Sequence, residues 1–302
     1  MKSGICEDER MTILYEKVTI IGLGLIGASI ALATRRAGVA GHITGCDSGD
    51  NIADEIASLN LVDSFIADAA DAVSDADLVI MAVPVGALGT LSANIIPKMK
   101  AGAVLTDTGS TKRSVMRDVA PNVKPHIHWL PSHPIAGTER SGPSAGHDTL
   151  FDERYWVILP LDVPLQVVDH FASYVEALGS ISERMEPDYH DKVLALTSHL
   201  PHLIAYTIVG TAVDLEGQLK NDVIRFSASG FRDFTRIAAS DPVMWRDVFL
   251  NNDEAVLEML QRFSEDLSFL QRAIRWQEGD KLEELFTRTR EIRRSIIDAG
   301  QS

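Results

Sequence analysis

The chain has 302 residues, of which 45% are hydrophobic and 24% charged, a composition that allows one large or two ordinary globular domains. Its formal net charge of −15 argues against nucleic acid or an anionic membrane as a partner, because either would require a basic face. No apolar run approaches the roughly 18 residues that span a bilayer, and residues 1–10 lack the apolar core of a signal peptide.

Two cysteines, Cys6 and Cys46, are present. They form no CxxC motif, no zinc-ligand spacing and no disulfide framework. We therefore expect two reduced thiols and a cytoplasmic protein.

Short β-branched runs alternate with helical segments in the first half of the chain. A helix is expected over Ile26–Ala37, ending at Gly38, which suits a left-handed cap. The expected strands are Lys17–Ile21, His42–Cys46, Leu78–Val83, Ala103–Thr106, His126–Leu130 and Trp156–Leu159. This alternation predicts βαβ units and a mostly parallel sheet of the Rossmann type.

The strand signal disappears after about Pro187, and the remaining sequence is helical. We therefore expect an α/β domain over residues 1–187 and an all-α domain over residues 188–302. Apolar residues step by four and three along one long helix, at Val256, Leu260, Phe263, Leu267, Leu270 and Ile274. This seam fits an intrachain core and a subunit interface equally well, and the sequence leaves both open.

A glycine-rich motif, Gly22-Leu-Gly24-Leu25-Ile26-Gly27, follows the first expected strand and opens the first helix. In that context the motif is typical of a dinucleotide-binding turn. Gly22 permits the tight turn, Gly24 lets the backbone approach a pyrophosphate, and Gly27 allows helix and strand to pack closely. The pyrophosphate would then lie on the backbone N–H groups at the helix N-terminus, around Leu25 and Ile26.

Asp47 ends the second expected strand, 20 residues beyond Gly27. An acidic side chain at this point accepts hydrogen bonds from the ribose hydroxyls of NAD and repels the 2′-phosphate of NADP. No arginine stands nearby to receive that phosphate, so NAD is the favoured cofactor. Val83 and Pro84, at the end of another strand, are expected to contact the cofactor as well.

Three clusters contain more polar residues than the fold itself requires, which indicates a functional site. Two follow strands, at residues 107–112 (DTGSTK) and 132–142 (SHPIAGTERSG), where open α/β sheets bind ligands. The third is helical and comprises residues 198–202 (SHLPH), 229–238 (SGFRDFTRIA) and 241–247 (DPVMWRD).

These motifs, in this order, resemble those of prephenate dehydrogenases, most closely the stand-alone cyclohexadienyl dehydrogenases of alphaproteobacterial type. The resemblance covers nearly the whole chain. It implies an NAD-dependent enzyme of tyrosine biosynthesis that decarboxylates prephenate oxidatively to 4-hydroxyphenylpyruvate, arogenate to tyrosine, or both. It also favours a homodimer formed through the helical half.

The resemblance implies two catalytic residues. His133 matches the family's catalytic histidine, which takes the proton of the ring hydroxyl, and a histidine suits a base that works near neutral pH. Ser110 matches the serine that hydrogen-bonds the substrate hydroxyl and the histidine. From its position Ser110 could also cap the helix that starts near Thr111.

Substrate contacts are implied for three further residues. Arg236 matches the family's carboxylate-binding arginine, and its planar fork suits a carboxylate. His202 is expected to contact substrate or cofactor, and Glu139 to lie at the mouth of the cleft. We also expect Asp233 to brace Arg236 and Trp245 to pack beneath it.

The pair His199 and His202 lacks the further ligand that a metal site would need, so no metal is predicted. Two alternatives stay open. A 3-hydroxyacid dehydrogenase with an all-α second half would usually place a catalytic lysine there, and none stands in such a motif. A non-catalytic NAD-sensing module would not need Ser110, His133 and Arg236 together.

Overall fold

The computed structural model describes residues 12–49, 52–214, 222, 225–226 and 229–298. The chain divides into two compact units, residues 1–253 and residues 254–302. Cys6 lies outside the described residues, whereas Cys46 is a buried free thiol.

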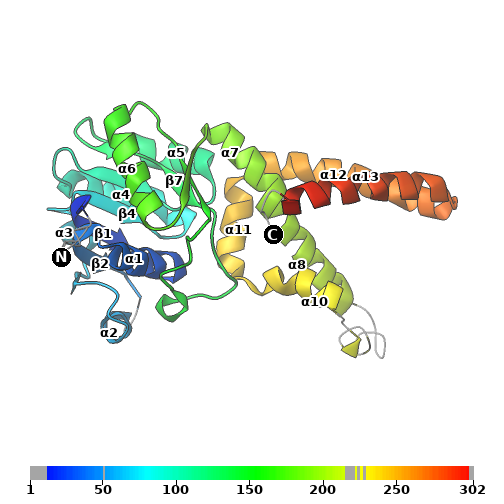
Figure 1. Ribbon diagram of the computed structural model, residues 1–302, viewed down its shortest axis with the longest axis horizontal. Coiled ribbons are helices and arrows are strands. Elements are labelled where there is room, and N and C mark those ends of the chain that lie inside the picture. The colour runs from blue at the N-terminus through cyan, green and yellow to red at the C-terminus, as the bar shows by residue number, and fades with distance from the viewer. Residues whose placement is uncertain (1–11, 50–51, 215–221, 223–224, 227–228, 299–302) are drawn as a thin grey trace, which may run out of the picture. The chain divides into compact units, whose positions relative to one another are not determined.

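A six-stranded parallel sheet, in the order β3-β2-β1-β4-β5-β6, forms the centre of the first unit (Figure 1). Its strands are β1 (Tyr15–Ile21), β2 (Ala40–Cys46), β3 (Ser64–Phe65), β4 (Leu78–Met81), β5 (Val104–Asp107) and β6 (His128–Trp129). Ile21 pairs with Cys46 on one side and with Met81 on the other, so β1, β2 and β4 end at the same level. This order confirms the predicted Rossmann-type fold, with its switch point between β1 and β4.

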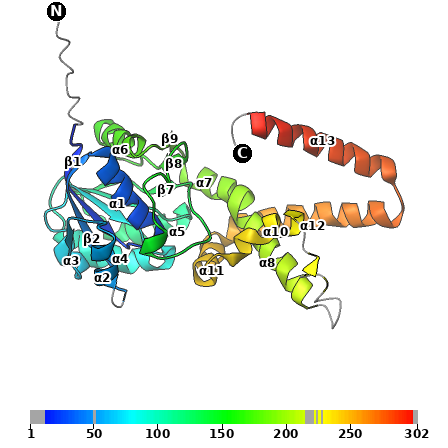
Figure 2. The same ribbon diagram turned by 60° about the horizontal axis from the view of Figure 1, so that its bottom comes forward.

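Helices pack against this sheet on both faces (Figures 1 and 2). They are α1 (Leu25–Ala37), α2 (Ile52–Ser58), α3 (Ala69–Ala72), α4 (Leu88–Ile95), α5 (Lys112–Val119) and α6 (Leu165–Ala177), with 3₁₀ turns at Val85–Ala87, Ile96–Lys98, Ala120–Asn122 and Pro143–Ala145. Along β4, Leu78 and Ile80 belong to the core shared with α1 and α6, whereas Val79 and Met81 belong to the core shared with α4. This alternation is what a strand buried on both faces requires. Helix α1 ends at Gly38 in the left-handed conformation (φ 62°), as predicted.

A second, three-stranded sheet was not predicted. It consists of β7 (Ser132–Pro134), β8 (Tyr155–Ile158) and β9 (Ile181–Arg184), in that order. His133, expected in a loop after a strand, is instead the central residue of β7 and pairs antiparallel with Val157. An edge strand tolerates Pro134, which has no N–H to donate, and this is why the segment does not read as a strand.

The chain after Pro187 is helical among the described residues, as predicted. Helix α7 (Pro187–Leu194), a π-helical turn (Ala195–His199) and α8 (Leu200–Val213) follow one another directly, and α10 (Ser229–Thr235), a 3₁₀ turn (Arg236–Ala239) and α11 (Pro242–Asn251) come next.

The stretch Pro187–Ala212 is long and apolar enough to cross a membrane by length and composition alone, with a mean hydropathy of 1.4 and only 28% of its most apolar window buried. This finding differs from the expectation that no apolar run is long enough to span a bilayer.

Helices α12 (Asp253–Arg275) and α13 (Gly279–Asp298) account for the described residues of the second unit. The predicted apolar seam lies on α12. Two of its members, Leu267 and Ile274, are 48% and 64% exposed, and Trp276 just beyond the helix is 72% exposed. Exposed apolar side chains in this number are typical of an interaction surface.

Candidate active site

The glycine motif has the geometry of a dinucleotide-binding turn. Gly22 has a positive φ of 90°, and a Cβ there would lie 2.4 Å from the carbonyl oxygen of Ala82. A Cβ on Gly27 would lie 1.8 Å from the carbonyl oxygen of Gly22, so only glycine lets α1 pack this closely on β1. A Cβ on Gly24 would meet nothing within 4 Å, which leaves open space where a pyrophosphate would approach.

No side chain caps the N-terminus of α1, so the backbone N–H groups at Leu25 and Ile26 are available to an anion. Asp47 follows the end of β2, where its Oδ2 accepts a hydrogen bond from Leu23 N at 2.7 Å and its Oδ1 accepts one from Gly49 N at 2.9 Å. The carboxylate is thereby fixed beside the turn, in the position from which it could meet a ribose.

Val83 and Pro84 follow β4 at the same edge of the sheet. Both side chains keep some exposure, and Cγ1 of Val83 lies 2.9 Å from the position that a Cβ of Gly22 would occupy. Val83 therefore borders the turn, and Pro84 follows it in the chain.

A buried ion pair holds the start of α5. Nζ of Lys112 donates to Oδ2 of Asp107 and to the carbonyl oxygen of Ser132, both at 2.5 Å, and both charged side chains are fully buried. Burial lowers the pKa of Lys112, and attraction to Asp107 opposes that shift. Nε1 of Trp156 donates to Oγ of Ser132 at 2.9 Å. These contacts join the end of β5 to β7 and β8.

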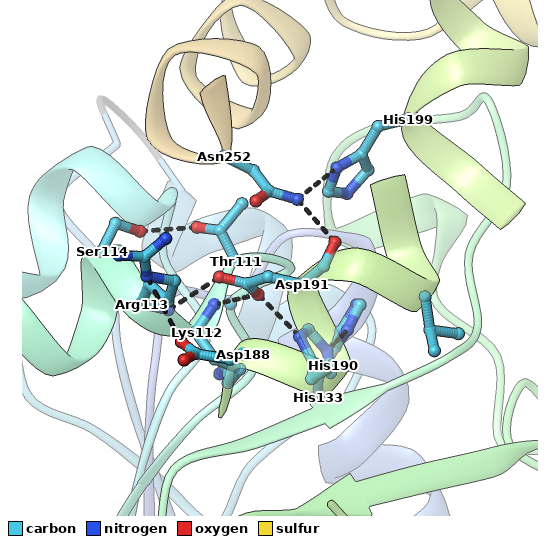
Figure 3. Close-up of polar contacts among 12 residues, drawn as sticks. Thr111, Lys112, Arg113, Ser114, His133, Asp188, His190, Asp191, His199 and Asn252 are labelled. Atoms are coloured by element: carbon cyan, nitrogen blue, oxygen red, sulfur yellow. Dashed lines mark hydrogen bonds and ion pairs between the residues drawn. The ribbon is translucent and has the colours of Figure 1, made fainter. Parts of the chain in front are cut away.

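Two histidines and an aspartate form a hydrogen-bonded chain that ends at His133 (Figure 3). Nδ1 of His133 lies 2.9 Å from Nε2 of His190, and Nδ1 of His190 lies 2.8 Å from Oδ1 of Asp191. The same carboxylate accepts hydrogen bonds from the backbone N–H groups of Lys112 at 2.7 Å and Arg113 at 2.8 Å. Asp191 of α7 therefore caps the N-terminus of α5 and binds His190 at the same time.

Burial is the main cause that holds the pKa of His133 well below its ordinary value, and the neighbouring His190 and Lys112 act in the same direction. The imidazole is therefore neutral at pH 7 and can accept a proton. His133 keeps some solvent-accessible surface, whereas the side chain of His190 is fully buried. Of the two, His133 is the one that a substrate can reach.

Asn252 joins this chain to a third histidine, His199. Its Nδ2 donates to the backbone carbonyl of Asp191 at 2.9 Å and to Nδ1 of His199 at 3.0 Å (Figure 3). Burial lowers the pKa of His199 to about 4, so this histidine is neutral. Its Nε2 is buried and has no hydrogen-bond partner among the residues that the structure describes.

His202 lies in a ring stack. Its imidazole is parallel to the ring of Trp245, with centroids 3.6 Å apart and an interplanar angle of 22°. The imidazole of His202 thus covers one face of the ring of Trp245, the residue that we expect to pack beneath Arg236. Nδ1–H of His202 donates to the carbonyl oxygen of Ser198 at 2.9 Å. Burial lowers the pKa of His202, and the hydrogen bond to the carbonyl of Ser198 acts in the opposite direction. The positive charge of Arg236 lowers this pKa further. The neutral ring therefore presents Nε2 as an acceptor.

Arg236 and Glu139 form an ion pair, with Nη1 2.6 Å from Oε2. The arginine side chain is 59% exposed and the glutamate 31%. The expectation that Asp233 braces Arg236 is wrong, because Asp233 pairs instead with Arg232, Oδ1 to Nε at 3.7 Å. Helix α10 ends at Thr235 and Arg236 begins a 3₁₀ turn, so the spacing of an α-helical face does not continue across this point.

Ser110 lies between β5 and α5 and is partly exposed. It is not the N-cap: that position belongs to Thr111, whose Oγ1 hydrogen-bonds with Oγ of Ser114 at 2.7 Å. Because Asp191 already occupies the first N–H groups of α5, the hydroxyl of Ser110 is left for another partner.

Contacts and charge effects link His133, through Asp191 and His199, to His202, Arg236 and Glu139. Sequence reasoning missed His190, Asp191 and Asn252, which connect the cluster and which no local motif marks. Within the described ranges, no group of three or more His, Cys, Asp or Glu side chains could hold a metal ion.

Comparison with known proteins agrees with this geometry. Residues 30–183 match the family "Prephenate dehydrogenase, nucleotide-binding domain", and residues 186–288 match "Prephenate dehydrogenase, dimerization domain". The fold and the site therefore define a dehydrogenase with a dinucleotide-binding domain. The chain belongs to the prephenate dehydrogenase family.

Individual relatives are similar over most of their length. The cyclohexadienyl dehydrogenase of Zymomonas mobilis is 41% identical over 94% of this chain and 97% of its own. The crystal structure of the Aquifex aeolicus prephenate dehydrogenase, in complex with hydroxyphenyl propionate and NAD+, has a TM-score of 0.86 at 30% identity and covers 93% of this chain and 98% of its own. The Synechocystis arogenate dehydrogenase structure has a TM-score of 0.77 at 26% identity, covering 92% and 99%.

Proposed function

We propose that this chain catalyses the NAD-dependent oxidative decarboxylation of prephenate to 4-hydroxyphenylpyruvate and of arogenate to tyrosine. The observation that carries the proposal is His133, a neutral and accessible imidazole on β7 whose Nδ1 is held by a hydrogen bond with His190, in a chain that also has a dinucleotide-binding turn. Incubation of the full chain with prephenate and NAD should yield 4-hydroxyphenylpyruvate and CO2 in equal amounts. NAD reduction without CO2 release would contradict it.

The cofactor contacts are assigned to the glycine turn, to the N-terminus of α1 with Leu25 and Ile26, and to Asp47 with Val83 and Pro84. NAD bound there supplies the acceptor for the hydride that leaves C4 of the ring. Open space at Gly24 and the uncapped helix N-terminus both fit its pyrophosphate.

His133 acts as the base in this proposal. Its Nε2 takes the proton of the C4 hydroxyl as the carbonyl forms, and the ring becomes aromatic when CO2 leaves. Ser110 hydrogen-bonds the same hydroxyl, a role that its unused side chain allows. As CO2 leaves C1, the electron pair of the broken C–C bond enters the ring and the C4 oxygen becomes a phenolate, which regains its proton from His133, so the step needs no other acid or base.

Arg236 binds a carboxylate of the substrate, and the exposed guanidinium can exchange Glu139 for it. His202 offers Nε2 as a hydrogen-bond acceptor at the same cluster. Glu139 stands where the substrate side chain would enter, and it can meet the ammonium group of arogenate.

The proposal includes a homodimer that forms through the helical half, with a cytoplasmic location and neither nucleic acid nor membrane as a partner. The match of residues 186–288 to a dimerization domain and the exposed apolar residues of α12 support the dimer. The apolar stretch Pro187–Ala212 is assigned to the site and to subunit contact, because a membrane span would bury the charges of Asp191 and Lys192 in lipid.

A further inference from the structure

We propose that His190 and Asp191 are positioning residues for the base: they hold His133 in the tautomer that carries its proton on Nδ1, so that Nε2 faces the substrate without a proton. The inference rests on the proposed function, in which His133 is the base. Neither residue contacts the substrate, and neither was marked by any motif of the sequence.

The argument follows the protons along the chain of hydrogen bonds. A carboxylate can only accept, so the contact of Nδ1 of His190 with Asp191 at 2.8 Å places the His190 proton on Nδ1. A neutral His190 then has a bare Nε2. That nitrogen lies 2.9 Å from Nδ1 of His133 and must accept a proton from it. The proton of His133 is thus on Nδ1, and its Nε2 lone pair is free.

Two conditions must hold for this order, and the surroundings meet both. Asp191 must be ionised: burial acts to raise its pKa, but hydrogen bonds from His190 and from two backbone N–H groups of α5 outweigh burial, and the pKa is below its ordinary value. His190 must be neutral: burial lowers its pKa, and the hydrogen bond to Asp191 opposes this without reversing it. A protonated His190 would instead donate to His133 and block the base.

Asp191 also joins the two catalytic candidates. Its carboxylate caps α5 through the backbone N–H groups of Lys112 and Arg113, in the segment that Ser110 and Thr111 precede, and it also binds His190. The side chains of Asp191 and His190 are 1% and 0% exposed, so water does not compete for these bonds. One buried group therefore fixes the backbone that carries the serine and the ring that orients the base.

The tautomer can be measured without any turnover. Two-bond ¹H–¹⁵N spectra of the full-length protein with ¹⁵N-labelled histidine, at pH 8, report which ring nitrogen bears the proton. The His133 signals are assigned by their loss in His133→Asn. We expect a protonated Nδ1 and a bare Nε2 on His133, and the same pattern on His190. A proton on Nε2 of His133 in the wild-type protein would overturn the inference, whatever the enzyme's substrate is.

Kinetics test whether this arrangement matters. His190→Leu removes the nitrogen that accepts the hydrogen bond from Nδ1 of His133. His190→Gln keeps an acceptor, because the side-chain oxygen of glutamine can reach the position of Nε2. For His190→Leu we expect kcat with prephenate to fall about tenfold or more, with KM within about threefold of wild type, because wrong-tautomer molecules lack a base. His190→Gln should recover most of kcat. The matched control is His170→Gln, an exposed histidine that donates to the carbonyl of Leu14 away from the site, and it should keep wild-type kinetics.

The outcomes are distinguishable. Equal losses in the Leu and Gln variants, with both proteins folded by circular dichroism, would mean that His190 serves only packing and would overturn the inference. If His190→Leu does not fold, the comparison of His190→Gln with wild type, together with the spectra, still decides. A wild-type protein that shows the expected tautomers but does not oxidise prephenate would contradict the proposed function and leave the hydrogen-bond order standing.

Discussion

Nη1 of Arg236 lies 2.6 Å from Oε2 of Glu139, so the two charged residues that we assign to substrate binding are paired with each other. A substrate carboxylate must therefore displace Glu139 from the guanidinium before it can bind there. The pairing also reduces the negative charge that Glu139 offers to an incoming ammonium group. Both effects bear on how the enzyme treats prephenate and arogenate, which differ only in a keto group against an ammonium.

Arg236→Ala should impair both substrates to a similar extent. The carboxylate that Arg236 holds is common to both, and the loss of a charge-assisted partner should raise KM by about tenfold or more. For the wild type we expect the two kcat/KM values to lie within about a hundredfold of each other, because Glu139, the carboxylate that we assign to the side-chain end, is paired with Arg236. Arg232→Ala is the control, since Arg232 is exposed and pairs with Asp233. Steady-state kinetics in which one substrate alone suffers would contradict this assignment.

NAD should outperform NADP by about tenfold or more in kcat/KM, because the fixed carboxylate of Asp47 repels a 2′-phosphate. Asp47→Ser should narrow the gap. Asp47→Asn removes the negative charge but keeps a hydrogen-bond acceptor, since the amide oxygen can still accept from Leu23 N or Gly49 N. It therefore tests the effect of the charge alone. Equal wild-type rates with the two cofactors would contradict the role of Asp47.

The fold was largely predictable because hydrophobic periodicity and glycine spacing are local. The strand after Gly41 and the cap at Gly38 appear directly in the sequence. Strand β7 was missed because Pro134 breaks the pattern, and β3 because two residues give no period. In the site, the pairing of His133 with His190 spans 57 positions, and nothing in the sequence near either residue signals it. His190 and Asp191 follow Pro187 in a polar first turn, which is the pattern of an exposed helix start.

The free energy of unfolding should fall as the pH drops from about 6.5 to 4, a range that begins above the pH at which most carboxylates titrate. The folded pKa of His199 is about 4, below its ordinary 6.5, so in this window the unfolded chain binds the proton more tightly and folding loses free energy as pH falls. The loss is at most about 3 kcal/mol. Thermal unfolding of His199→Gln should show a shallower decline than wild type, with His170→Gln as the exposed control. Parallel pH curves for all three proteins would be evidence against a neutral His199.

The protein should be a dimer of about twice the 33.0 kDa chain mass in light scattering at micromolar concentration. The half-exposed Leu267 and Ile274 on α12 are the reason, because an apolar face of this kind is covered in the stable assembly. Replacing both with Glu should lower the mass to that of the monomer. A wild-type monomer at this concentration would rule out the subunit contact.

The central claim is that His133 is the base of an NAD-dependent oxidative decarboxylation, and absorbance at 340 nm with prephenate and NAD tests it most directly. The wild-type protein should reduce NAD, and His133→Asn, which keeps the size but removes the base, should lower kcat by about 10²–10⁴-fold with KM for prephenate largely kept. No NAD reduction by the wild type, or a His133→Asn variant with near wild-type kcat, would contradict the account.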